Sequence, residues 1–567
     1  MFASVTTDPT SFAGWSWAQI EPYYRDLAGR TLTAGSVAEF LTDWTWLSER
    51  ISETQARLRV ATTQNTTDEE AERQYHLFLE QIFPAAQAAE QGLKAHLLAS
   101  GRAPHGFALP LRKMAADAAI FREPNLALLA EEQKLVIRHN KILGAQTVRW
   151  DGRELTLPQL RPFGKDPDRS VRERAWRLAA ERQAADYDAI AELWRQLLTL
   201  RQRIAANATA GDYRAFKWQQ LHRFDYSPSD CASFREAIAQ VVVSAARRVY
   251  ERRRRRLGVE TLRPWDLPAD SLGRPPLTPF HDAAELQGRA AAIFHRVDDR
   301  LGVYFDTMIQ EALLDLTNRK GKGPGGYCTS FAASKRPFIF MNAVGLHGDV
   351  QTLLHEAGHA FHVFERNALP YLQQRVVGAE FGEVASMSME LLASPYLAAS
   401  EGGFYSEGDA ARAHIEHLEQ IILFWPYMAV VDGFQHWVYE HPEDAGDPSR
   451  CDAAWTALWE RFMPGVEWSG LEAHMAAGWQ HKHHIHTVPF YYVEYGLAQL
   501  GAVQVWGHAL RDQDAAVAAY RRALARGGTA SFPELYGEAG ARFAFDPATL
   551  ERGIGLMEGI LARLDPD

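Results

Sequence analysis

The sequence predicts a mainly α-helical protein. Hydrophobic residues recur with the helical period over long stretches, whereas segments with strand-like alternation are few and short. The chain has 567 residues, of which 47% are hydrophobic, so it can bury a large core. Its length alone would allow roughly two to four domains.

The predicted helices follow one another along the whole chain. The first two, at residues 36–62 and 67–100, have the heptad-like pattern of a helical hairpin. The others are expected at residues 128–143, 169–206, 232–257, 282–316, 409–440 and 498–526. A boundary near residue 200 would divide an N-terminal helical domain, 1–200, from a larger domain, 201–567, with the two halves free to share helices.

Strand-like segments occur at two places. One is Thr147-Val148-Arg149-Trp150, which stands beside the turn dipeptide Asp151-Gly152. The other, residues 336–342, is apolar and rich in β-forming residues, and we expect an edge strand that can pair with an extended peptide.

Charge and cysteine content indicate the compartment and exclude some partners. The net charge of −11 argues against nucleic-acid binding. Cys231, Cys328 and Cys451 are odd in number and widely separated, which is typical of a reducing compartment. No signal peptide is visible, and the longest apolar run, at 421–431, is too short to span a bilayer. We therefore expect a cytoplasmic protein without membrane contact; the sequence leaves its oligomeric state open.

Five consecutive arginines at 252–256 could suggest a nucleic-acid signal. They precede Gly258, and cations at the end of a helix complement its dipole. The end of a helix is therefore the better interpretation.

The segment His355-Glu356-Ala357-Gly358-His359 is an H-E-x-x-H motif. On a helix the two histidines project from the same face, one turn apart, where both can bind one Zn²⁺. Glu356 lies beside them, where it can accept a proton from the water that the metal activates. Zinc prefers tetrahedral nitrogen and oxygen ligands, and a hydrolytic site leaves one position to water.

The same five residues could also be a solvated surface helix. Apolar neighbours such as Leu353, Leu354 and Phe361 instead indicate a buried helix. Buried polar groups need partners, which a metal supplies. Gly358 lowers helix propensity, so we expect that its small size lets another backbone or a substrate approach closely.

A third protein ligand should follow the motif. Position 365 is Glu365, which rules out a third histidine six residues on. Glu383 lies on a second predicted helix, 24 residues beyond His359. Glu380 and Glu390 share a face with it and remain alternatives.

The motif and four further segments resemble one family. In order along the chain, residues 319–328, 355–362, 381–392, 431–439 and 489–500 resemble the oligoendopeptidase F group of thimet-oligopeptidase-like zinc peptidases. Residues 1–200 carry no matching motif, and their length and helical character are merely compatible with the family.

The resemblance implies a fold and an activity. The fold would have two helical halves that enclose a deep substrate channel, with a small sheet beside the zinc-binding helix. The activity would be zinc-dependent endopeptidase cleavage of short peptides. The matching positions would supply His355, His359 and Glu383 as ligands of one Zn²⁺ per chain and Glu356 as general base. Mn²⁺ or Co²⁺ would also suit these donors.

The family also uses a histidine and tyrosines to bind substrate and stabilise the oxyanion. His486, Tyr491 and Tyr495 fit these roles best, with His486 five residues before Tyr491. Pro489 and Phe490 replace the glycine-rich, mobile segment of the thimet branch, which suggests a stiffer segment and leaves Tyr492 as an alternative.

Two other functions compete with this interpretation. A metallocarboxypeptidase or dipeptidase of similar helical fold also combines H-E-x-x-H with a later glutamate. A non-catalytic helical peptide-binding protein could keep the motif as a relict, although both histidines, the glutamate and the base are all present.

Overall fold

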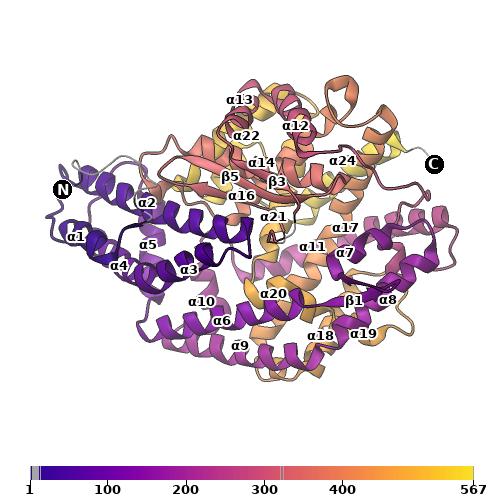
Figure 1. Ribbon diagram of the computed structural model, residues 1–567, viewed down its shortest axis with the longest axis horizontal. Helices are drawn as coiled ribbons and strands as arrows, with labels where there is room; N and C mark the ends of the chain where they lie inside the picture. Colours follow the sequence, from indigo (N-terminus) through magenta and orange to yellow (C-terminus); the bar gives the residue numbers. More distant parts are fainter. Residues whose placement is uncertain (1, 3–11, 13, 320, 324, 566–567) are drawn as a thin grey trace. The chain divides into compact units, whose positions relative to one another are not determined.

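A computed structural model describes the chain except for residues 1, 3–11, 13, 320, 324 and 566–567 (Figure 1). The prediction of a mainly α-helical fold is confirmed. The chain forms two compact units, and each is assembled from three separate segments. The first unit comprises residues 1–119, 278–413 and 498–543; the second comprises 120–277, 414–497 and 544–567.

The boundaries at 413/414 and 497/498 fall inside helices α17 (Glu407–Glu440) and α21 (Tyr492–Ala509). The division into 1–200 and 201–567 stays a prediction, and residue 200 itself lies inside α9 (Tyr187–Asn207) of the second unit.

The first unit contains an N-terminal helical group and the helices that surround a small sheet. Its helices are α1 (Trp17–Ala28), α2 (Val37–Gln64), α3 (Glu69–Leu77), α4 (Phe83–Ser100), α5 (Ala108–Ile120), α12 (Ala283–Val297), α13 (Asp299–Gln310), α14 (His347–Arg366), α15 (Leu372–Arg375), α16 (Ala379–Ala393), α22 (Gln513–Ala525) and α23 (Phe532–Glu538). The predicted stretch at 282–316 is divided because the Asp298 carboxylate caps α13, accepting hydrogen bonds from the backbone N–H groups of Arg300 and Leu301.

The second unit is also mainly helical. Its helices are α6 (Pro124–Gly144), α7 (Leu157–Leu160), α8 (Arg169–Ala184), α9, α10 (Tyr213–Gln220), α11 (Pro228–Leu257), most of α17, α18 (Pro448–Phe462), α19 (Glu472–Ala476), α20 (His483–Thr487) and α24 (Pro547–Leu564). The arginine run ends α11, as expected, before Gly258 in a left-handed conformation. Its members pair with Glu419, Glu251 and Asp565.

The predicted strand at 147–150 forms in the second unit as one arm of a β-hairpin. Strand β1 (Thr147–Trp150) pairs antiparallel with β2 (Arg153–Thr156). Asp151 and Gly152 connect them with φ angles of 48° and 82°, the positive values that a tight hairpin turn requires. Among the described residues, no helix is both long and apolar enough to cross a membrane.

A three-stranded sheet lies beside α14 in the first unit (Figure 1). Its order is β3 (Leu314–Thr317), β5 (Arg336–Ala343), β4 (Tyr327–Phe331), with β3 parallel and β4 antiparallel to β5. The expectation that residues 336–342 form an edge strand is wrong, because β5 is central. Successive buried residues such as Ile339 and Phe340 cover both of its faces, which is typical of a central strand. The edge strand next to the motif helix is β4.

Candidate metal centre

Helix α14 carries the H-E-x-x-H motif and is largely buried. Asp349 is a plausible N-cap by residue type, but the helix begins at His347, so Asp349 stands in the first turn. Its carboxylate accepts hydrogen bonds from the N–H groups of Val344 and Leu346 and so fixes the entry into the helix. Leu353 and Leu354 are 1% exposed, which agrees with the expected buried helix.

The two histidines of α14 meet Glu383 of α16. Glu383 Oε2 lies 3.3 Å from His355 Nε2 and 3.5 Å from His359 Nε2. One potential ligand atom from each of the three side chains lies within 4.8 Å of the others. Both histidine side chains keep about a quarter of their surface exposed, so solvent reaches the site.

Gly358 lets α16 approach α14 closely. A Cβ atom built on Gly358 would stand 2.5 Å from the carbonyl oxygen of Ala385 and 2.6 Å from Cα of Ser386. Any larger residue would have to push α16 away, together with Glu383. The expectation that another backbone approaches Gly358 is confirmed.

Glu390 supports one of the histidines. Its Oε1 atom lies 2.6 Å from His355 Nδ1 and accepts a hydrogen bond from the Nδ1–H tautomer, in which Nε2, on the side of Glu383, carries the lone pair that can bind a metal. The sequence placed Glu390 on the same helical face as Glu383 but did not assign it this contact.

Glu356 lies next to the three side chains without joining them. It is 8% exposed, and the backbone of Cys328 in β4 favours the charged form of its carboxylate. Burial raises the pKa of its carboxyl to about 7, and the nearby Glu383 adds to this rise. A carboxyl with a pKa near neutrality can both accept and return a proton.

The three donor side chains differ in their affinity for protons. Burial opposes a charge on His355, but hydrogen bonds to Glu383 and Glu390 outweigh it and raise its pKa well above the usual value. Burial lowers the pKa of His359 to about 4, so this ring is neutral at pH 7. Although burial works the other way, His359, His355 and Ser386 hold the pKa of Glu383 at about 2, so it stays ionised.

The residues fit a zinc ion. Bonds of about 2.0–2.2 Å in a tetrahedron place neighbouring ligand atoms about 3.3–3.6 Å apart. The 3.3 and 3.5 Å separations of Glu383 Oε2 from the two Nε2 atoms match this spacing. Two imidazoles and one carboxylate are also a donor set that zinc hydrolases use.

The remaining predicted residues, His486, Tyr491 and Tyr495, belong to the second unit. His486 is fully buried: its ring stacks on His139, 4.2 Å between centroids, and on Trp479 at 5.9 Å. Tyr491 and Tyr495 are half-buried, with ring centroids 5.1 Å apart. The structure therefore brings the two tyrosines together and packs His486 into the core of its unit; the roles of all three stay predictions.

A neighbouring histidine, His484, contacts the tyrosines instead. Its ring centroid lies 5.1 Å from that of Tyr492, 5.9 Å from Tyr495 and 6.2 Å from Tyr491. Tyr492 is buried, and its hydroxyl accepts a hydrogen bond of 2.8 Å from Lys482 Nζ. Nothing in the histidine cluster at 481–486 distinguishes His484 from His486 in sequence, because both precede the tyrosines by similar intervals.

A strained residue precedes these tyrosines. Phe490 has φ of +66°, which is rare for a residue with a bulky side chain. Its N–H donates to Gln435 Oε1 at 2.6 Å, and its carbonyl accepts from Arg223 Nη2 at 2.7 Å. Arg223 also pairs with Glu494 at 2.5 Å, and all these partners are buried. The segment expected to be stiff is thus held at both backbone polar groups of Phe490.

Comparisons with known proteins agree with one another. The family model of peptidase family M3 matches residues 163–554. Similar solved structures include one described as PZ peptidase A with an inhibitor, which is 28% identical with a TM-score of 0.89 and coverage of 100% of both chains. Another, described as a putative oligoendopeptidase F, is 28% identical with a TM-score of 0.88 and 97% of each chain covered. A putative oligoendopeptidase F from Bacillus anthracis str. Ames is 25% identical, with a TM-score of 0.85 and the same coverage. No curated protein matches the chain.

Proposed function

The chain belongs to peptidase family M3 and is a metallopeptidase, and from this premise we propose that it is a zinc-dependent endopeptidase acting on short oligopeptides. One observation carries the proposal: two imidazoles, one carboxylate and the separate carboxyl of Glu356 meet on two adjoining helices. Two similar structures are described as putative oligoendopeptidase F, which supports the endopeptidase assignment.

His355, His359 and Glu383 would hold the zinc ion. When bound, zinc supplies a Lewis acid that polarises the peptide carbonyl and makes water more acidic. Glu390 keeps His355 in the tautomer that presents Nε2 to the ion, and Ser386 donates a hydrogen bond of 3.0 Å to Glu383 Oε2.

Glu356 would act as the general base. The backbone of Cys328 in β4 favours the charged form of its carboxylate, which could accept a proton from the attacking water. Glu356 would then deliver this proton to the leaving amine nitrogen. Its pKa near 7 is suited to both transfers.

Strand β4 would align the substrate. Among the described strands, it pairs only with β5, so its other edge can pair with an extended peptide by β-augmentation. Pairing with β4 would position the scissile bond through backbone hydrogen bonds. The alignment would therefore depend little on the side chains of the substrate. The strand proposed to pair with the substrate is therefore β4 and not β5.

Tyr491 or Tyr495 would donate a hydrogen bond to the oxyanion, and one such donor is typically worth about 3–4 kcal/mol. Tyr492 is buried, whereas Tyr491 and Tyr495 are half-buried, which supports the latter two. His486 keeps its predicted role in substrate binding. Because the ring of His486 is fully buried, His484, whose ring contacts that of Tyr495, is the better candidate for the histidine that orients the tyrosines.

Mass spectrometry of a digested peptide mixture tests the proposed function. The chain should cut internal bonds, lose activity with a chelator and regain it with Zn²⁺. Replacement of Glu356 by Gln should retain zinc and lose nearly all turnover. Cleavage only at free C-termini, abolished by C-terminal amidation, would instead identify a metallocarboxypeptidase or dipeptidase.

A further inference from the structure

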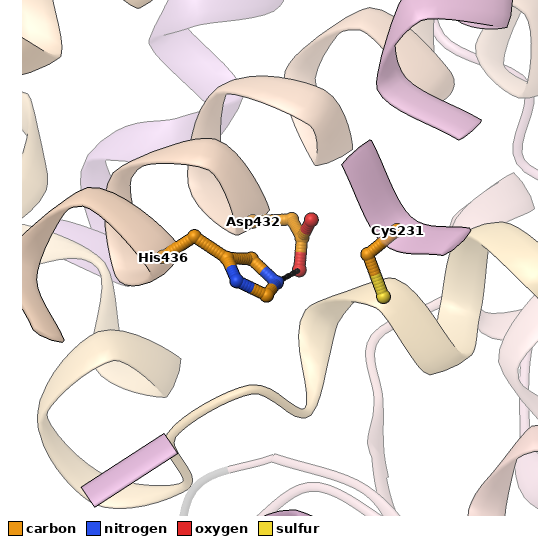
Figure 2. Close-up of side chains that lie close together, drawn as sticks. All are labelled: Cys231, Asp432 and His436. Atoms are coloured by element: carbon orange, nitrogen blue, oxygen red, sulfur yellow. Dashed lines mark ion pairs between the residues drawn. The ribbon is translucent and has the colours of Figure 1, made fainter. Parts of the chain in front are cut away.

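A second cluster of metal-ligating side chains lies inside the second unit (Figure 2). Cys231 comes from α11, while Asp432 and His436 stand one turn apart on α17. In Figure 2 the side chains of Asp432 and His436 point toward each other with Cys231 beside them, and one potential ligand atom of each of the three lies within 4.8 Å of the others. Cys231 and Asp432 are fully buried, and His436 is 2% exposed.

Two atoms of this cluster lack a hydrogen-bond partner among the described residues. These are Asp432 Oδ1 and His436 Nε2. They face each other at 3.6 Å, which is too long for a hydrogen bond. Buried polar atoms without partners are rare and destabilising, and a single cation bound between these two atoms would satisfy both.

The spacing of the two atoms is that of metal ligands. At the candidate catalytic centre the corresponding distances between nitrogen and oxygen are 3.3 and 3.5 Å. The 3.6 Å between Asp432 Oδ1 and His436 Nε2 is slightly longer and lies at the upper end of the tetrahedral edge of about 3.3–3.6 Å expected for zinc. We propose that Cys231, Asp432 and His436 bind a second, structural zinc ion.

The charges around the cluster permit this ion. Arg235 pairs with the other carboxylate oxygen, Asp432 Oδ2, which orients the carboxylate and leaves Oδ1 for the metal. Arg223, the other cation that acts on Cys231, is paired with Glu494. A thiolate and a carboxylate together offset the charge of a divalent cation.

The protonation states define how the ion would bind. Burial lowers the pKa of His436 to about 4, so the imidazole is neutral and ready to donate its lone pair. Burial raises the pKa of the Cys231 thiol, so without metal the thiol keeps its proton. Binding of Zn²⁺ would form the metal–sulfur bond and release this proton to solvent, and the affinity would therefore rise with pH.

The proposed ion has a structural role that is independent of the proposed peptidase function. Its three ligands are shielded from solvent, and it would join α11 to α17. The His436 ring also packs against the strained Phe490, with centroids 5.3 Å apart. The ion would thus support the segment that carries Tyr491.

Cobalt substitution of the full chain tests the proposal. A thiolate bound to Co²⁺ gives a sulfur-to-metal charge-transfer absorption in the near ultraviolet, which histidine and carboxylate ligands do not give. We expect this band in the wild-type chain, together with about two metal ions per chain. The Cys231→Ser variant should lose the band and about one ion, while peptidase activity tests the other centre separately.

The remaining cysteines provide matched controls. Cys451→Ser removes another buried free thiol, and Cys328→Ser removes the thiol nearest Glu356; both variants should keep the band. A wild-type chain that binds about one ion without the band overturns the proposal, as does a band that disappears with Cys328. The spectrum of the wild-type chain alone shows whether a thiolate binds the metal. Misfolding of a variant would therefore not obscure this result.

Discussion

At the scale of single residues, Gly358 decides how closely the two ligand-bearing helices approach. A methyl group at this position would overlap the backbone at Ala385 and Ser386. We expect Gly358→Ala to displace Glu383 and to weaken zinc affinity about 10–100-fold, as changes in the support of ligands commonly do. Titration with a zinc buffer measures the affinity.

Gly382 on α16 provides the control for this substitution. No atom lies within 4 Å of a Cβ built there, so Gly382→Ala should leave zinc affinity unchanged. It should also stabilise the helix slightly, since alanine has the higher helix propensity. Equal affinities for the two alanine variants would contradict the packing argument.

The contact between Glu390 and His355 gives a second prediction. Glu390→Gln keeps an acceptor near Nδ1 but removes the negative charge that makes the imidazole a stronger ligand. We expect a zinc affinity lower by about tenfold at this centre, whereas Glu383→Ala should lose most of the zinc bound at this centre. Metal analysis after dialysis ranks the variants; the reverse order would exchange the assigned roles of the two glutamates.

The sequence predicts residues that lie close together along the chain better than contacts between remote residues. His355, Glu356 and His359 follow from the geometry of one helix, so five residues of sequence were enough. The burial of His486 depends on His139 of α6, which is remote in sequence. The cluster of Cys231 with Asp432 is equally invisible, because only the packing of α11 against α17 brings the two residues together.

At the scale of elements, the segment between α20 and α21 is held by its neighbours. Gln435 accepts the hydrogen bond of the strained Phe490, and Gln435→Met would leave this buried N–H without a partner. We expect a loss of about 1–3 kcal/mol in the free energy of unfolding. If Tyr491 acts on the oxyanion, kcat should fall more than KM rises.

Urea unfolding and steady-state kinetics check this prediction. Gln196, an exposed residue of α9, provides the control, since its replacement by Met should change neither quantity. Unchanged stability of Gln435→Met would mean that Gln435 does not hold the segment. A loss of stability without any change in kcat would mean that the segment between α20 and α21 stabilises the fold but does not contribute to catalysis.

The strands show which features of an element a local pattern predicts. The strand at 147–150 and the turn at Asp151-Gly152 were predicted, and the two adjacent residues with positive φ close this turn into a hairpin with β2. The apolar run at 336–342 predicted a strand but gave the wrong position in the sheet. The neighbours of β5 are set by residues outside the run, and its continuous burial is the mark of a central strand.

At the scale of the whole molecule, buried histidines make stability depend on pH. Burial and the nearby His139 hold the pKa of His486 well below its usual value, and burial lowers that of His481 to about 4. In the unfolded chain both would titrate near 6.5. Below that pH the unfolded state binds more protons, so the free energy of unfolding should fall as the pH drops from about 6.5 towards 4.

Denaturant unfolding at several pH values measures this dependence, and Trp479 beside His486 supplies a fluorescence signal. Each such histidine should contribute up to about 1.4 kcal/mol per pH unit. The His486→Phe variant should show a shallower slope over this interval. An identical slope in wild type and variant would assign the acid sensitivity to other groups.

The interleaved segments of the two units have a consequence for synthesis on the ribosome. The first 119 residues emerge early, yet their unit also requires residues 498–543. During most of translation helices α14 and α16 therefore lack α22 and α23, against which they pack in the folded unit, and apolar surfaces left exposed in this way are prone to aggregate. Nascent chains stalled before residue 498 should recruit chaperones and resist productive release, and no continuous fragment should reproduce either unit.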